Sequence, residues 1–166
     1  MGIFGKPNFD KLKRKRDVKG LIKLLGHKDP WVRETAVKSL GDVGYDAEVA
    51  SALAKMLKDE NPGVRHHAPF ALGHLMFVGY QTDDSNRIVF SALIEALIHE
   101  DKGVRSSAAG LLREIDQDWK VFTGSEAGKS AISILNKALK DKEVEVRKVS
   151  REILKKMKAQ KKLKNV

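Results

Sequence analysis

Three histidines near the middle of the chain are the first candidates for chemistry. His66, His67 and His74 lie within a stretch of nine residues, and neutral imidazole is a common ligand of zinc and iron. On a helix, a seven-residue spacing places His67 and His74 on one face but about 10 Å apart, too far to share one ion without a third ligand. No carboxylate accompanies them in the motif. We therefore expect no metal and no cofactor, and interpret the histidines as solvated polar residues on an inner surface.

Other catalytic patterns are incomplete. The segment 123–130 is similar to a phosphate-binding loop, but Thr123 stands where that motif needs a glycine, and no buried strand precedes it. We interpret it as a connection in which Ser125 caps the next helix. The absence of cysteine excludes disulfides and thiolate chemistry and favours a reducing cytoplasm. No histidine has an acid in a catalytic motif, so the sequence favours a protein without catalytic residues.

Phe70 lies between the histidines and has two interpretations. The aligned positions elsewhere in the chain are Lys38, Gly110 and Glu152, so an exposed Phe70 would be an anchor for a partner. Alternatively, it packs beneath the neighbouring repeat, where Gly110 leaves room. Pro69 removes a helical hydrogen bond and predicts a kink. The predicted partner-binding residues are His66, His67, Phe70 and His74.

Both ends of the chain are basic. The net charge is +10, with +7 on residues 1–28 and +7 on residues 145–166, so the middle is net acidic. Such clusters bind phosphates through counterion release, or they solubilise the terminal repeats, and the sequence leaves both open. The predicted patch for an acidic partner consists of Lys11, Lys13, Arg14, Lys15, Arg16, Lys155, Lys156 and Lys158.

Leucine and arginine recur in a pattern that occurs four times along the chain, and this pattern predicts the helices that position the residues above. The arginines, which we predict to be a structural column, are Arg33, Arg65, Arg105 and Arg147, each preceded by valine. Leucines stand twelve and eight residues before each arginine and seven after it. Self-similarity at this period indicates stacked repeats, each formed by two antiparallel helices.

The turn residues locate the helices. Asp29, Asn61 and Asp101 are good N-caps for the second helix of a repeat, and Asn8 caps a short first helix. Because the arginines are 32, 40 and 42 residues apart, insertions are expected near 79–85 and 117–128. The expected helices are 9–15, 18–26, 31–43, 47–58, 63–77, 86–99, 103–116, 127–140 and 144–159.

The combined motif is Leu-x3-Leu, Asp-x-Asp/Asn-Pro-x-Val-Arg and Ala-x3-Leu-Gly, clearest over residues 21–41 and 53–73. It resembles HEAT repeats, in particular the phycobilisome-lyase HEAT-like type, over about residues 8–158. The resemblance implies a helical solenoid but no single activity, because the family includes adaptors, lyase subunits, a hydroxylase and DNA-handling proteins.

Two family features are altered in this chain. The family's Asp six residues before each arginine forms a ladder with neighbouring repeats, and that column here contains His27, Asp59, His99 and Asp141. The resemblance therefore implies a ladder interrupted at two of its four positions. The di-iron hydroxylase of this type carries His-Glu directly after the arginine, and no repeat of this chain does.

We predict an all-α, right-handed α-solenoid of four HEAT-like hairpins with a short N-terminal capping helix, in one domain spanning 1–166. The repeats are expected at about 17–44, 47–78, 86–116 and 127–158, with a basic tail at 159–166. The predicted function is a non-catalytic scaffold that binds a protein partner on its concave face. Two alternatives stay open: a nucleic-acid-binding repeat protein that uses its lysine-rich ends, and a lyase- or hydroxylase-like enzyme or subunit. We expect a cytoplasmic monomer with no membrane partner.

Overall fold

The computed structural model describes residues 7–44, 46–78, 83–115 and 125–163. Within these ranges all regular structure is helical, which confirms the all-α prediction. The chain divides into two compact units, Met1–Tyr80 and Gln81–Val166, which we call the N-terminal and C-terminal units. In the described ranges, no helix combines the length and apolar character needed to cross a membrane.

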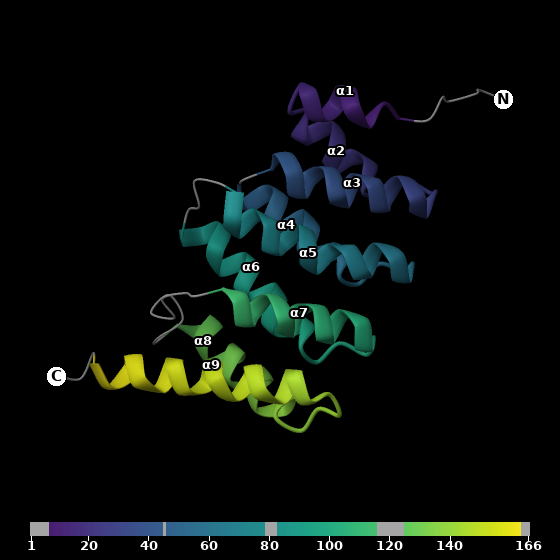
Figure 1. The fold of residues 1–166 in the computed structure, drawn as a ribbon. Helices are drawn as coiled ribbons and strands as arrows, with labels where there is room; N and C mark the ends of the chain where they lie inside the picture. Colours follow the sequence, from purple (N-terminus) through teal and green to yellow (C-terminus); the bar gives the residue numbers. More distant parts are fainter. Residues whose placement is uncertain (1–6, 45, 79–82, 116–124, 164–166) are drawn as a thin grey trace. The chain divides into compact units, whose positions relative to one another are not determined.

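The N-terminal unit is a stack of helices built around two parallel neighbours, α3 and α5 (Figure 1). Both are second helices of a repeat. The first helices α2 and α4 pack against α3 and α5 respectively, and the short α1 also packs on α3. The helices are α1 (Phe9–Arg14), α2 (Val18–Leu24), α3 (Pro30–Val43), α4 (Ala47–Met56) and α5 (Pro62–Val78).

The C-terminal unit repeats this arrangement with two hairpins. Helix α6 pairs with α7 and α8 pairs with α9, while α7 stacks on α9 and α6 on α8. The helices are α6 (Asp83–Ala96), α7 (Lys102–Glu114), α8 (Glu126–Ala138) and α9 (Val144–Leu163).

The leucine columns form the core of both units. Side chains twelve residues before each arginine are fully buried, at 0% exposure for Leu21, Leu53, Leu93 and Leu135. Those seven residues after each arginine are also buried. The small residues between them, such as Ala36 and Ala68, are fully buried and allow the helices to approach closely. The repeated leucine and alanine positions are therefore the positions that pack between the stacked helices.

Helices begin where the capping residues predict. The side chains of Asn8, Asp29, Asp101 and Ser125 each accept a hydrogen bond from a backbone N–H in the first helical turn. These bonds satisfy donors that the helix itself leaves without a partner. The predicted cap at Ser125 is thus present, with Gly128 N–H donating at 3.1 Å.

Differences from the predicted helices lie at ends and insertions. Helix α9 continues to Leu163, four residues beyond its expected end, because Lys, Ala and Gln all favour helix. Pro69 lies inside α5 without ending it, and the predicted kink stays a prediction. Most of the two expected insertions, with Thr123 in the second, lies outside the described residues.

Candidate functional site

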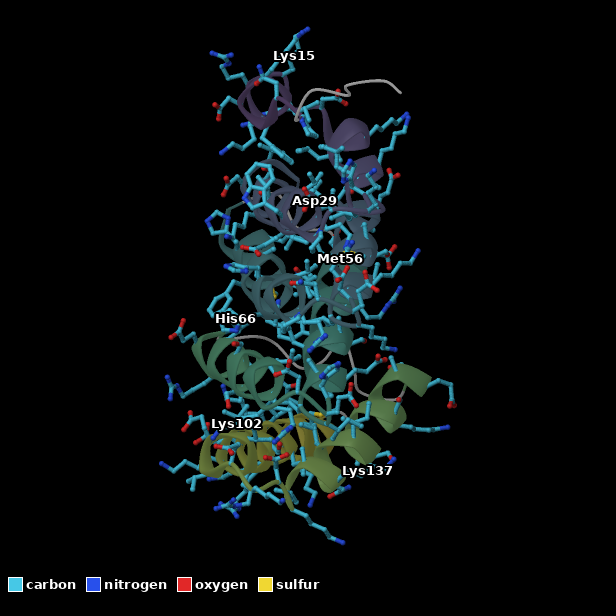
Figure 2. The ribbon with its side chains drawn as sticks, turned by 90° about the vertical axis from the view of Figure 1, so that its right-hand side faces the viewer. Lys15, Asp29, Met56, His66, Lys102 and Lys137 are labelled. Atoms are coloured by element: carbon cyan, nitrogen blue, oxygen red, sulfur yellow. The ribbon has the colours of Figure 1, made fainter. Side chains whose placement is uncertain are left out.

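The four predicted partner-binding residues lie on one helix, α5, in the N-terminal unit. Phe70 is 48% exposed, a large fraction for an aromatic side chain. The His66 ring meets Phe70 edge-on, with ring centroids 5.4 Å apart, and meets His67 at 5.5 Å. Figure 2 shows His66 at the outer edge of the unit. The structure therefore brings His66, His67 and Phe70 together on an accessible face.

His67 is held by the first turn of its own helix. Its Nδ1 lies 2.8 Å from the carbonyl oxygen of Gly63 and 3.5 Å from Oε1 of Glu34 on α3. Because a carbonyl oxygen only accepts hydrogen bonds, Nδ1 must carry the hydrogen. In the neutral ring, Nε2 is then a hydrogen-bond acceptor.

His74 links α5 to α3. Its Nδ1 lies 2.8 Å from the carbonyl oxygen of Gly41 on α3. Gly41 is in the last turn of α3, where carbonyls lack a partner within the helix, so His74 donates to a group that would otherwise need water. The same reasoning leaves Nε2 of neutral His74 as an acceptor.

A hollow lies beside these histidines, where α3 and α5 approach each other closely. A Cβ at Gly41 would lie 3.1 Å from Cα of Ala71 and 3.2 Å from its Cβ, so glycine permits this packing. The hollow has a volume of about 190 Å³. Its lining residues are Lys38, Gly41, Asp42, His67, Phe70, Ala71 and His74.

The charged groups around this hollow are engaged in ion pairs. Lys38 Nζ lies 2.7 Å from Oε1 of Glu34, and Lys13 Nζ lies 3.5 Å from Oδ2 of Asp42. The hydrogen bond from Lys38 lowers the pKa of Glu34 and outweighs burial, which raises it. Each lysine thus faces a carboxylate, so the pairs around the hollow balance in charge.

The sequence pattern indicates only part of this lining. It points to His67, Phe70 and His74, but not to Gly41 and Asp42 as lining residues. The Leu-Gly pair that ends the motif in the first two repeats was the available signal for Gly41. Within the described residues, no three His, Cys, Asp or Glu side chains are grouped to hold a metal ion.

The four column arginines share one local contact. In each, Nη1 donates to the carbonyl oxygens six and five residues earlier, at 2.7 to 3.3 Å. These bonds close the turn between the two helices of a repeat. The geometry supports a structural role for Arg33, Arg65, Arg105 and Arg147.

Within each unit, the first arginine also reaches the next repeat. Arg33 forms a two-pronged pair with Asp59, with Nε–Oδ2 at 2.8 Å and Nη2–Oδ1 at 2.9 Å. Arg105 Nε lies 2.8 Å from Oδ2 of Asp141, an ion pair whose N–H is poorly aligned for a hydrogen bond. Both contacts occur where the residue six positions before an arginine is aspartate. Each unit therefore has one such arginine–aspartate pair between its two repeats.

His27 and His99 occupy the positions equivalent to Asp59 and Asp141, and they keep the turn hydrogen bond that these aspartates accept. Nδ1 of His27 and of His99 accepts the N–H of the residue two positions later, both at 3.0 Å. Asp59 and Asp141 accept the equivalent N–H at 2.8 Å. Imidazole therefore replaces carboxylate as the acceptor in the turn.

The basic residues lie on the terminal helices of the two units. Lys11, Arg14, Lys15 and Arg16 are exposed at α1, while Lys13 pairs with Asp42. Figure 2 shows Lys15 at the end of the N-terminal unit. Lys155, Lys156 and Lys158 are exposed on α9.

Arg16 has an unusual backbone. Its φ of 50° is the one positive value for a non-glycine residue in the described ranges. Arg16 N–H donates to Lys13 O at 3.0 Å, and Asp17 N–H donates to Leu12 O at 3.0 Å. This is the Schellman motif that ends many helices, with arginine in the position where glycine is usual.

Comparison with known proteins finds one family model that matches part of the chain. Residues 10–73 match the family model for HEAT repeats, which confirms the resemblance for the first two repeats. No curated protein matches the sequence. The lyase-like type of repeat stays a prediction.

Solved structures confirm the repeat-solenoid fold class. An engineered protein superposes with a TM-score of 0.62 at 21% identity, over 91% of this chain and 66% of its own. A computationally designed armadillo repeat protein for modular peptide recognition gives 0.57 at 22%, over 89% and 67%. An archaeal HEAT-like repeats protein from Thermococcus onnurineus NA1 gives 0.50 at 17%, over 95% and 82%. This chain thus spans less than two thirds of the engineered protein's length.

Proposed function

We propose that this chain, whose residues 10–73 match HEAT repeats, is a non-catalytic scaffold that binds a protein partner. The contact surface is the face of α3 and α5 that carries Phe70 and the adjacent hollow. The observation that carries the proposal is the 48% exposure of Phe70 beside a hollow of about 190 Å³. Exposed aromatic side chains next to a pocket are typical energetic centres of protein interfaces.

The size of the hollow favours a protein over a small molecule. Sites for cofactors and metabolites usually enclose about 300–1,000 Å³, whereas this hollow has about 190 Å³. That volume suits one inserted side chain. A partner can add further contacts along the exposed faces of α3 and α5.

The rigid helices favour binding without reorganisation. The histidine rings at the surface are already fixed to the carbonyls of Gly63 and Gly41, so little side-chain freedom is lost when a partner docks. A designed protein with this type of fold was made for modular peptide recognition, which supports a peptide or protein as ligand.

The test begins with the partner that co-purifies with the protein from its own cells. Its affinity is then measured by calorimetry for the wild type, for Phe70→Ala and for Ile132→Ala. Ile132 is a matched control because it is an exposed hydrophobic residue, at 41% exposure, on α8 of the other unit. The proposal requires a large loss for Phe70→Ala and none for Ile132→Ala.

The exposed basic side chains of α1 and α9 support nucleic acid as a second candidate. Lysines such as Lys11 and Lys15 can neutralise phosphates, and such binding weakens steeply with salt. A gel shift at low salt should decrease when Lys11, Lys13, Lys15 and Arg16 are changed to glutamate. A shift that the four changes leave intact removes this candidate.

A further inference from the structure

We propose that the hollow between α3 and α5 receives one aromatic side chain that carries a hydrogen-bond donor, a tyrosine or a tryptophan of the protein partner. This inference rests on the proposed function and specifies the chemistry of its anchor. We call this hollow, with the lining residues given above, the α3–α5 socket.

The walls of the socket favour an aromatic ring. Its lining includes the two smallest residues, Gly41 and Ala71, which approach each other closely, together with Phe70 and the imidazoles of His67 and His74. Aromatic rings pack favourably edge-on or offset against each other. His66 already packs edge-on against Phe70, so an inserted ring would extend an existing aromatic cluster.

The charges around the socket favour an uncharged occupant. On α3, Glu34 and Asp42 are carboxylates and Lys38 is a cation, and Lys13 approaches Asp42 from α1. An inserted arginine or lysine would lie near two cations, and an inserted glutamate near two carboxylates. Either charge would lose its hydration without an unshared counter-ion, which is costly.

The hydrogen-bonding capacity of the socket requires a donor. Because His67 and His74 donate through Nδ1 to backbone carbonyls, their Nε2 atoms are acceptors in the neutral rings. Lys38 Nζ, the cationic donor of the lining, gives one of its three N–H groups to Glu34 at 2.7 Å, and this ion pair holds it on the α3 side.

Together these features favour tyrosine and tryptophan over phenylalanine as the occupant. A leucine or phenylalanine would fill the socket but would displace water from acceptors without replacing its hydrogen bonds. The hydroxyl of tyrosine or the indole N–H of tryptophan supplies the missing donor.

The experiment selects peptides from a random displayed library against the whole chain and measures each selected peptide by calorimetry. The expected consensus contains tyrosine or tryptophan at one position. Binding should be lost in Phe70→Ala and retained in Ile132→Ala. Replacing the consensus tyrosine by phenylalanine should weaken binding about five- to tenfold, the equivalent of one net hydrogen bond.

The acceptors are then identified with variants that preserve the fold. His67→Asn and His74→Asn place an amide N–H near the position of Nδ1, so they can still donate to Gly63 and Gly41, but they remove Nε2. In at least one of these variants, tyrosine and phenylalanine peptides should bind equally. Thermal melting of each variant confirms that it is folded.

Two outcomes overturn the inference in different ways. A consensus of aliphatic or charged residues that depends on Phe70 contradicts the aromatic donor and leaves the proposed function intact. Selected peptides that bind Phe70→Ala as tightly as the wild type contradict both. A tyrosine-to-phenylalanine loss that persists in both asparagine variants contradicts the assignment of the acceptors.

Discussion

The ion pair between Arg33 and Asp59 provides a quantitative test of how the N-terminal unit is held together. The change is Asp59→His, because the chain itself has histidine at two equivalent positions. Histidine can still accept the N–H of Asn61, as His27 and His99 do in their own turns. The substitution therefore removes the anion that faces Arg33 while keeping the turn.

The magnitude follows from burial and geometry. The side chains of Arg33 and Asp59 are 8% and 7% exposed and are joined by two bonds of 2.8 and 2.9 Å. Removing one partner of a buried pair costs about 3–5 kcal/mol, because the other charge stays buried. Glu60 also contacts Arg33, at 3.0 Å, but is 85% exposed, so we expect the lower end, about 3 kcal/mol.

The assay is urea unfolding at neutral pH, followed by thermal melting. A loss of about 3 kcal/mol corresponds to a decrease in Tm of about 6–12 °C for a chain of this length. Adding Arg33→Met to Asp59→His should recover part of the loss, because the unpaired buried charge is then gone. Asp141→His is the matched comparison and should cost less, since Asp141 and Arg105 are each 14% exposed.

A loss below about 1 kcal/mol for Asp59→His would refute this reasoning, because that is the contribution of an exposed pair. An Asp59→His variant that Arg33→Met destabilises further, without recovery, would show that Arg33 acts through its turn carbonyls and not through the pair.

Three further predictions follow from single contacts. Burial raises the pKa of Asp59, but Arg33 and a backbone N–H lower it below its usual value. In acid unfolding, the ionised carboxylate should therefore stabilise the fold fully above about pH 3.9, and this contribution should be lost at lower pH. The contribution should be absent in Asp59→Asn. Arg16→Gly should raise the free energy of unfolding by about 1 kcal/mol relative to Arg16→Ala in urea unfolding, because Arg16 has a φ of 50°; equal stabilities would contradict this. Gly41→Ala should lower Tm, because its Cβ would lie 3.1 Å from Cα of Ala71 and overpacking typically costs about 1–3 kcal/mol; an unchanged Tm would show that the helices can separate at no cost.

The fold could be predicted well because the residues that pack between stacked helices recur at fixed intervals in the sequence. Each buried leucine column and each capping residue depends on its own segment of chain, and local rules describe such segments. The end of α9 was missed because the transition from a packed helix to a lysine-rich continuation changes composition gradually.

The role of the two histidines that replace aspartate in the column could be predicted only in part. The column shows where aspartate is missing, but not that Nδ1 of His27 and of His99 takes over the turn hydrogen bond. That contact depends on the side-chain rotamer and tautomer, which residue type alone does not determine.

The socket could not be predicted from sequence. It requires Gly41 of α3 and Ala71 of α5 to meet, although thirty residues separate them along the chain. The aligned columns identify Phe70 and the histidines as unusual, and the structure places Phe70, His67 and His74 in the lining of one hollow.

The most direct test of the central claim is the affinity of the purified natural partner for three forms of the protein. Phe70→Ala should weaken binding about thirtyfold or more, the effect of removing an interface residue worth about 2 kcal/mol. Ile132→Ala should bind as the wild type does. Equal affinities for wild type and Phe70→Ala would contradict the assignment of the α3–α5 face as the partner site.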